Sequence, residues 1–355
     1  MSDVGGRGQD GVAATPPGHA DIRTRRQRMN IRPVRASRGL RTILVATALL
    51  FVTSALVQPE SLSRSSFFGM LPFAAVLAII AVGQTLVVQQ GGIDLSVPGM
   101  ISISVVIVTH EPNGDNSKLL PAVLMAYGVA LATGLLTGLI VSRLRMPAIV
   151  TTLGTNALLY AGVLGISGGT PRNTSPALHS IAADKPLGVP NAVFFAIAVT
   201  AVAGFIVKRS VAGRRFEAVG ANAAAADAAG LRVVRHRFTA YVWASLLYCT
   251  AGVLLAGIVT APSAFQGDPL LLPSVAAVVL GGTSLLGGKG SPTASAVAAL
   301  FLSQLDQFVL TIGVNSAVKN LVEAGALALG VAVYSVDWRR LVGLVRPVRP
   351  APRLS

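Results

Sequence analysis

Residues 65–93 read SSFFGMLPFAAVLAIIAVGQTLVVQQGGI and contain no aspartate, glutamate, lysine or arginine. A helix that crosses the hydrocarbon core of a bilayer needs roughly 20 mostly apolar residues, so this run is long enough. Its apolar part is followed at residues 83–92 by glutamines and glycines. The stretch therefore predicts a membrane-spanning helix that ends in a polar, glycine-rich segment.

Similar uncharged or nearly uncharged runs recur along the rest of the chain. One such run would also suit the core helix of a soluble protein, but no soluble fold buries so many of them. The chain is therefore predicted to be an all-α, polytopic membrane protein with about ten transmembrane helices. The runs are 42–59, 65–93, 95–110, 119–142, 146–171, 186–207, 238–267, 269–288, 292–314 and 317–336.

The basic residues predict how the chain is oriented. If the N-terminus is cytoplasmic, 24 of the 29 lysines and arginines fall in segments on the inside, as the positive-inside rule requires. The net charge of +15 is then mainly a topology signal, with the arginine-rich N-terminal tail against anionic lipid and no nucleic-acid partner. We expect a disordered basic cytoplasmic tail at 1–40, a transmembrane domain at 41–337 and a basic cytoplasmic tail at 338–355, so that both termini are cytoplasmic.

The composition excludes several other classes of protein. The chain is 52% hydrophobic and 12% charged, whereas a soluble domain carries roughly 25% charged residues. Cys249 is the only cysteine, and the four histidines show no metal-ligand spacing. The segment 282–290 lacks the spacing of a phosphate-binding loop, because position 283 is threonine and Gly290 follows Lys289. We expect no enzymatic site, no metal and no cofactor on this chain.

Three polar, glycine-rich segments interrupt the apolar background. The first, 83–98, includes Asp94, which at membrane depth needs partners such as Ser96 and nearby backbone N–H groups. Two roles stay open for this segment: it lines a solute path, or Asp94 caps the helix that follows. The polar residues that we assign to a candidate translocation path are Gln84, Thr85, Asp94, Ser96, Thr155 and Asn156.

The second segment is the long inside loop 208–237. Gly220 and Gly230 bracket an alanine-rich stretch, which predicts a helix of about nine residues. A short helix with an apolar side, exposed between two spans, requires a partner groove, and a solvated connector is the alternative.

The third segment, 278–292, resembles the first. Val87-Val88 before Gly91-Gly92 parallels Val278-Val279 before Gly281-Gly282, which indicates an internal duplication offset by about 190 residues. A second glycine pair, Gly287-Gly288, follows in the same segment.

Two further patterns lie within the predicted spans. Gly134-x-x-x-Gly138 predicts close helix packing. Lys319 and Glu323 are four residues apart and can pair on one helix face, whereas Asp306 keeps an ion-coupled mechanism open.

In this order and spacing, the motifs resemble the permease subunit of ribose/xylose/arabinose-type bacterial ABC importers, over about 42–334. The matching stretches are GGIDLSV at 91–97, PAIVTTLG at 147–154, RFEAVGAN at 215–222 with Gly230-Leu231, and VLGGTSLLGGKG at 279–290.

The resemblance implies that partner proteins supply the functions that this chain lacks. Two permease copies, alike or related, would line a central path in the bacterial inner membrane. A cytoplasmic ATPase pair would bind ATP and Mg, and a soluble or lipid-anchored binding protein would deliver a small polar solute, a monosaccharide by this resemblance. The family's cytoplasmic coupling helix corresponds to the second segment, and the residues it assigns to ATPase coupling are Arg214, Arg215, Phe216, Glu217, Gly220, Asn222 and Gly230.

The chain also departs from the family pattern. The family usually has acidic residues at positions 223 and 224, a basic one at 227, asparagine at 306 and lysine at 323, whereas this chain has Ala223, Ala224, Asp227, Asp306 and Glu323. An ABC permease for branched-chain amino acids or nucleosides, and an ion-coupled transporter that works alone, remain as alternatives.

Overall fold

The computed structural model describes residues 38–170 and 172–313, together with 317, 318, 321, 324, 325 and 328. All of them belong to the unit Ala36–Ser355. The predictions for Lys319, Glu323, the C-terminal tail and nearly all of the N-terminal tail lie outside the described residues.

The described part of the chain is helical and has no strand. It contains twelve α-helices and four short 3-10 helices, which are η1 (Pro59–Leu62), η2 (Asn116–Lys118), η3 (Pro186–Gly188) and η4 (Asp268–Leu270). The α-helices are α1 (Arg38–Val57), α2 (Arg64–Gln89), α3 (Val97–His110), α4 (Leu119–Ser142), α5 (Ala148–Ser167), α6 (Pro176–Ala183), α7 (Asn191–Arg209), α8 (Val211–Ala221), α9 (Ala223–Ala228), α10 (Val233–Ile258), α11 (Leu271–Leu280) and α12 (Pro292–Thr311).

Seven described helices are long and apolar enough to cross a membrane: α1, α2, α4 with η2, α5, α7, α10 and α12. They confirm an all-α, polytopic fold. The runs 95–110 and 269–288, predicted as full spans, form the shorter apolar helices α3 and α11. The predicted run 317–336 lies mostly outside the described residues. The described residues therefore contain seven candidate spans, and the total of ten stays a prediction.

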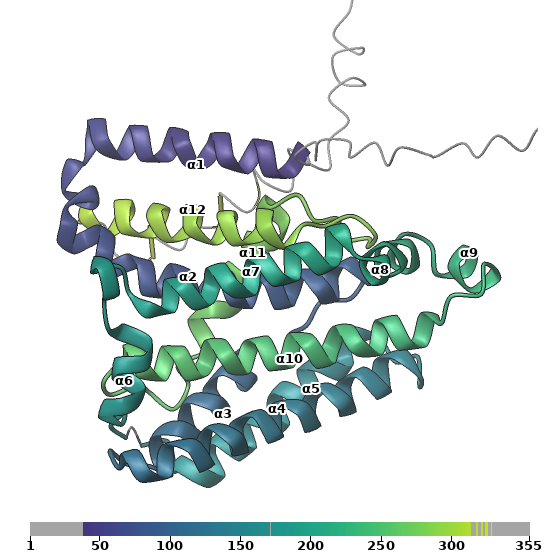
Figure 1. Cartoon of the computed structure of the whole chain (residues 1–355), viewed down its shortest axis with the longest axis horizontal. Coiled ribbons are helices and arrows are strands. Elements are labelled where there is room, and N and C mark those ends of the chain that lie inside the picture. The colour runs from purple at the N-terminus through teal and green to yellow at the C-terminus, as the bar shows by residue number, and fades with distance from the viewer. Residues whose placement is uncertain are drawn as a thin grey trace, which may run out of the picture. The chain divides into compact units, whose positions relative to one another are not determined.

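Helix α2 lies at the centre of the bundle, and Figure 1 shows α10 and α12 running beside it. It is the most buried of the seven spans, followed by α10. Gly83 allows this proximity, because a Cβ at that position would lie 2.8 Å from Cε1 of Tyr248 on α10. The helices farther out, such as α1, α5 and α7, expose many large apolar side chains, as surfaces against lipid do.

The Gly134-x-x-x-Gly138 pattern has the packing role that the sequence predicts. A Cβ on Gly134 would lie 2.8 Å from Cα of Val242, and one on Gly138 would lie 2.9 Å from the Phe238 carbonyl oxygen. Both neighbours belong to α10. The two glycines therefore let the α4 and α10 backbones approach closely.

The connections between helices divide between two ends of the bundle. Figure 1 shows α8 and α9 at one end and α6 at the other. The end with α8 and α9 also contains the end of α2, the α4–α5 connection with Arg143 and Arg145, and the start of α10 with its three arginines, since all of these line one cavity. The described segments that the sequence predicts to be on the inside thus lie at the same end of the bundle. Their cytoplasmic location remains a prediction.

Candidate functional site

The three glycine-rich segments meet at one place in the structure. The backbone N–H of Gly288 donates to the Gln89 carbonyl oxygen at 2.8 Å. The side-chain amide of Gln90 donates through Nε2 to the Phe216 carbonyl oxygen at 2.9 Å. We call the contact among residues 89–91, 216–221 and 287–290 the glycine junction. It joins α8 directly to the end of the central helix α2.

Glycine is required in the glycine junction because backbones touch there. A Cβ on Gly220 would lie 1.9 Å from the Gln89 carbonyl oxygen, which no side chain can do without displacing the backbone. Gly287 and Gly288 have φ of 92° and 79°, the left-handed region that favours glycine, and a Cβ on Gly288 would lie 2.6 Å from Cα of Ala221.

Helix α8 is held firmly at its start. Ser210 caps it, accepting a hydrogen bond from the Gly213 N–H at 2.9 Å. Lys208 at the end of α7 pairs with Glu217 on α8. Phe216 meets the His236 ring edge-on, with centroids 6.4 Å apart. Helix α8 is therefore in contact with α7, α10 and the glycine junction.

The predicted nine-residue helix between Gly220 and Gly230 is wrong in detail. Gly220 lies inside α8, and the alanine stretch gives the six-residue helix α9. Asn222 separates the two helices with an extended backbone, and its Oδ1 accepts a hydrogen bond from the Ala225 N–H at 3.0 Å. Gly230, with φ of 79°, ends the segment before α10. Arg214 and Arg215 are exposed on α8.

The loop between α2 and α3 is built around Asp94. Its Oδ1 accepts hydrogen bonds from the backbone N–H and the hydroxyl of Ser96, at 2.9 and 2.6 Å. Gln84 on α2 donates through Nε2 to the Asp94 carbonyl oxygen at 3.3 Å and accepts the Tyr248 hydroxyl at 2.7 Å. All four residues are buried, so this network fixes the loop inside the protein, as unpaired backbone at membrane depth requires.

The other candidate path residues also make hydrogen bonds within the protein. Thr85 donates to the Ser295 hydroxyl at 2.8 Å and so ties α2 to α12. Asn156 on α5 accepts the Gly99 N–H at 2.8 Å, and Thr155 lies 3.1 Å from the Thr137 hydroxyl. These six residues stabilise the described conformation, and their role in solute passage remains a prediction.

The first and third segments make the same backbone turn. The N–H groups of Gly91 and Gly92 donate to Val88 and Val87, and those of Gly282 and Thr283 donate to Val279 and Val278. Gly91 and Gly282 both have φ of 78°. Gly282 thus matches Gly91, and Gly281 occupies the place of Gln90. The shared turn is a Schellman-type helix end, which also closes α9 at Gly230, so the internal duplication stays a prediction.

Sequence reasoning missed the groups that face these motifs from other helices. Tyr248 completes the Gln84 network, and Thr152 accepts the Leu95 N–H at 3.0 Å. Gln89 is fully buried, yet its side-chain amide makes no hydrogen bond within the part of the chain that the structure describes. A single polar residue in an otherwise apolar run is the one signal that could have pointed to Tyr248. The described residues contain no cluster of metal-ligating side chains.

This bundle, with buried polar loops between its helices and a short helix braced against the central one, defines a polytopic membrane protein. The chain belongs to the family described as the permease component of the branched-chain amino acid transport system, whose pattern matches residues 66–332. Membership confirms the resemblance that the four sequence motifs indicate, and the chain is a transport subunit.

Curated relatives cover most of the chain. It is 31% identical over 295 residues to the ribose import permease protein RbsC of Escherichia coli K12, covering 82% of this chain and 92% of that one. It is 33% identical to the probable ABC transporter permease protein y4mJ of Sinorhizobium fredii, over 91% and 95% of the two chains. It is 32% identical to the autoinducer 2 import system permease protein LsrC of Enterobacter sp. strain 638, over 88% and 90%. No solved structure gives a significant match.

Proposed function

We propose that this chain is the permease subunit of an ABC importer and carries a monosaccharide or a similar small polar solute into the bacterial cell. The names of its relatives, ribose import permease and autoinducer 2 import permease, support a polar solute of this size. The lack of a phosphate-binding loop in the sequence supports ATP and Mg binding on a partner ATPase.

The proposal includes the partners that such an importer needs. A second permease copy, identical or related, completes the path, an ATPase pair docks on α8 and α9, and a binding protein meets the opposite end with α6. The end that carries α8 and α9 is then cytoplasmic, as are both termini, and the protein resides in the inner membrane. The basic residues gathered at that end support this orientation.

The glycine junction is the observation that carries the proposal. Through Gln90 and Gly288, the backbone of α8 and the 281–291 loop are both hydrogen-bonded to the end of α2. A force applied to α8 by an ATPase therefore reaches the central helix through one contact. From there the Gln84, Asp94 and Ser96 network extends it into the buried loop. Alternating access follows if ATPase closure moves α8 and switches the loop between two arrangements.

The test is uptake by the assembled system. The chain is co-expressed with the ATPase and binding protein encoded near it, reconstituted in vesicles, and supplied with labelled ribose on the binding-protein side and ATP on the ATPase side. We expect ATP-dependent ribose uptake that unlabelled pentoses reduce and leucine or adenosine does not. Competition by leucine or adenosine alone would favour the amino acid or nucleoside alternative. Uptake without ATP that collapses with the ion gradient would overturn the proposal and favour an ion-coupled transporter.

A further inference from the structure

A cavity of about 1050 Å³ opens at the end of the bundle that holds α8 and α9. Its lining comes from the end of α2, the α4–α5 connection, α9 and the start of α10. None of the candidate coupling or path residues lines it. The cavity is of the size at which proteins bind small molecules.

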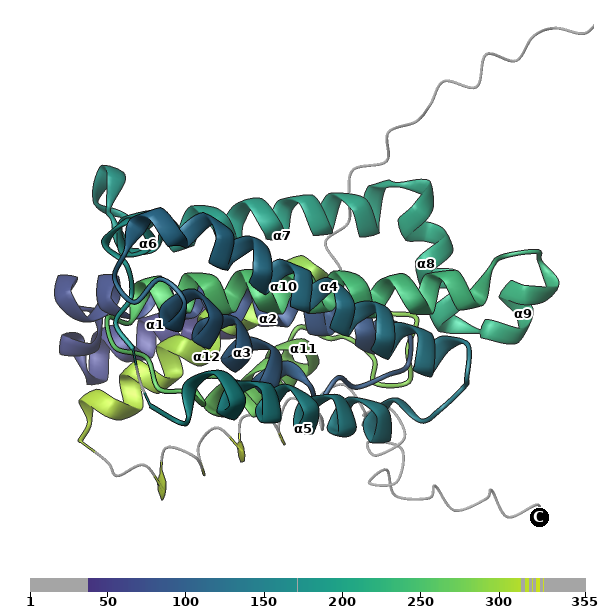
Figure 2. The same ribbon diagram turned by 90° about the horizontal axis from the view of Figure 1, so that it is seen from below.

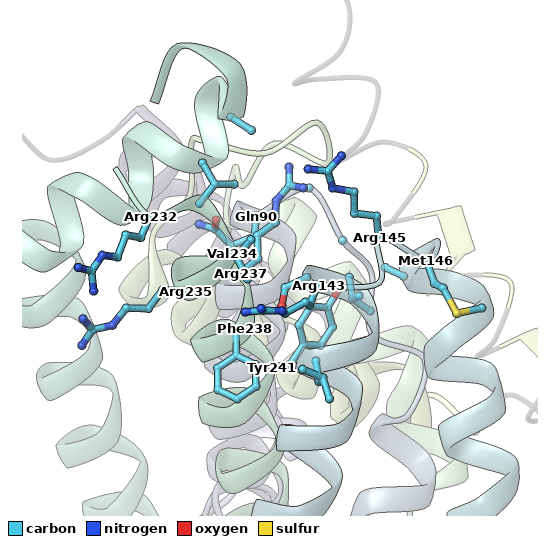
Figure 3. A pocket seen from close by; sticks show the side chains of 18 of the residues that line it. Gln90, Arg143, Arg145, Met146, Arg232, Val234, Arg235, Arg237, Phe238 and Tyr241 are labelled. Atoms are coloured by element: carbon cyan, nitrogen blue, oxygen red, sulfur yellow. The ribbon is translucent and has the colours of Figure 1, made fainter. Parts of the chain in front are cut away.

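The charge of the cavity is strongly positive. Its lining includes Arg143, Arg145, Arg232, Arg235 and Arg237, and one acidic residue, Asp227. In Figure 3 the side chains of Arg232 and Arg235 extend outward, whereas Arg143 and Arg237 lie with Gln90 and Tyr241 in the centre of the view. Arginine presents several N–H donors in a planar fork that suits oxyanions.

Buried polar groups in the cavity have no partner within the described part of the chain. Two of them are donors, Nε of Arg237 and Oγ of Ser142, and one is an acceptor, Oε1 of Gln90, which an anion would not satisfy. Ser142 is 5% exposed and Gln90 is 6% exposed, so water does not readily satisfy them. Buried donors without acceptors are rare, because each costs about 1–3 kcal/mol. A topology signal needs positive charge at this end but does not require an arginine Nε and a serine hydroxyl to be buried without acceptors.

Two helix starts around the cavity favour an anion, whereas the C-terminal end of α4, which lines it at Leu139, Val141 and Ser142, opposes one. The starts of α5 and α10 line it at Ala148 and Val233, and neither helix has a side-chain cap. Uncapped helix starts present free N–H groups and a partial positive charge. The end of α2 also lines the cavity, but the carbonyl groups of Val87, Val88 and Gln89 already accept hydrogen bonds. The last carbonyl groups of α2 are therefore already paired.

We propose that this cavity binds a phosphate group, carried by a small phosphate ester or by a lipid headgroup. Arg143, Arg237 and Ser142 supply donors from two different elements, which suits the several oxygens of a phosphate better than the two of a carboxylate. Asp227 on α9 faces the same cavity and opposes the anion. A bound phosphate would thus link the start of α10 to the α4–α5 connection. The binding itself stands independently of the transport function proposed above.

The test measures phosphate binding to the full chain, purified in an uncharged detergent. Inorganic phosphate is titrated by calorimetry against sodium chloride of equal ionic strength. We expect saturable binding of phosphate and none of chloride. Arg237→Gln removes a charged donor and should weaken binding about tenfold. Ser142→Ala should weaken it about threefold.

Two further variants separate the proposal from misfolding and from general charge. Asp227→Asn removes the opposing carboxylate and should strengthen binding about threefold, a gain that a damaged fold cannot give. Arg209→Gln is the matched control, because Arg209 is an exposed arginine near α8 that does not line the cavity. It should leave binding unchanged.

A second arm identifies the source of the phosphate. Dihexanoyl phosphatidylglycerol is titrated below its micelle concentration, alone and with inorganic phosphate as competitor. Binding of both probes, sensitive to Arg237→Gln, assigns the site to phosphate in general, and binding of the lipid alone assigns it to a headgroup. No saturable binding of either probe, or equal loss with Arg209→Gln and Arg237→Gln, would overturn the proposal.

Discussion

At the scale of single residues, Gly220 does what no other amino acid can do at its position. Its Cα hydrogen points at the carbonyl oxygen of Gln89, which at the same time accepts the Gly288 N–H. A methyl group there would separate α8 from α2 and break that hydrogen bond. The residue is thus a requirement of packing rather than of helix geometry.

We predict that Gly220→Ala lowers the free energy of unfolding by about 1–3 kcal/mol, the range for overpacking a close contact. The measurement is thermal unfolding in detergent. Gly165→Ala is the control, because Gly165 lies on α5 with no atom within 4 Å of a Cβ. It should be neutral or stabilise by up to about 1 kcal/mol. Equal stability of the two variants would show that the junction is not closely packed.

The buried hydrogen bond from Tyr248 to Gln84 gives a second prediction. Tyr248→Phe leaves Oε1 of the fully buried Gln84 without its donor, which should cost about 1–3 kcal/mol. Tyr127→Phe removes the hydroxyl 2.8 Å from that of the partly buried Thr250, and should cost about 0.5–1.5 kcal/mol. Thermal unfolding of both variants decides, and a larger loss for Tyr127→Phe would contradict the buried network.

Much of the candidate site could be predicted as motifs, but not as contacts. Gly220, Gly287 and Gly288 stand out in the sequence because they occur in polar segments of an apolar chain. That these segments meet could not be foreseen, since Gly220 is 67 positions from Gly287 and 131 positions from Gln89. Tyr248 and Ser142 stayed unnoticed, because each is a single polar residue in a span and its partners come from other helices.

At the scale of elements, the pair α4 and α10 shows how short side chains set the distance between spans. Without a hydrophobic force between helices in lipid, association depends on close backbone packing. Gly134 and Gly138 supply it, and the Ser245 hydroxyl adds a hydrogen bond to the Ala130 carbonyl oxygen at 2.8 Å.

Gly134→Ala should therefore weaken the α4–α10 packing, by about 1–3 kcal/mol. Gly128→Ala is a matched control on the same helix, because a Cβ there meets no atom within 4 Å. Unfolding midpoints of the two variants, in the same detergent, check the prediction. A loss for Gly128→Ala as large as that for Gly134→Ala would assign the effect to helix propensity instead.

The limits of helices were harder to predict than their existence. The uncharged run 238–267 corresponds to α10, which spans Val233–Ile258. The helix begins before the run because charged residues do not prevent helix formation outside the apolar layer. It ends before the run does, at the segment that starts with Val259 and contains Pro262. The run 269–288 becomes the short helix α11, since Gly281 and Gly282 end it. Absence of charge marks where a span can be, and turn residues decide where it ends.

At the scale of the whole molecule, the connections between helices lie at two opposite ends of the bundle, and labelling can measure which side of the membrane each end faces. Lys118 lies on η2 before α4, and Ala218 lies exposed on α8. The two positions belong to connections at opposite ends of the bundle, because α4 runs from η2 to the cavity beside α9.

We predict that Ala218→Cys reacts with a membrane-impermeant maleimide only from the cytoplasmic side, and Lys118→Cys only from outside. Cys249 is fully buried, so the unsubstituted chain is the background control. The outer side is tested with intact cells and the cytoplasmic side with inverted vesicles. Labelling of both cysteines in the same one of these two samples would disprove the orientation.

The fold class was predictable because length and absence of charge alone determine whether a helix can span a bilayer. The sequence predicts the orientation equally directly, because the positive-inside rule depends only on where the lysines and arginines lie along the chain. The basic cavity was not predictable, because its arginines were interpreted as a topology signal. That these arginines line one cavity with Ser142 is visible only in the packed structure.

The most direct test of the account is whether an ATPase docks on α8. The chain is co-expressed with its neighbouring ATPase and pulled down in detergent, as wild type, as the Arg215→Ala/Glu217→Ala double variant, and as Arg172→Ala, an exposed position outside the end with α8. We predict that the ATPase is retained by the wild type and by Arg172→Ala, and is reduced at least about tenfold by the double variant, as for loss of charged contacts at an interface. Equal retention by all three, or solute uptake by the chain with no ATPase bound, would contradict it.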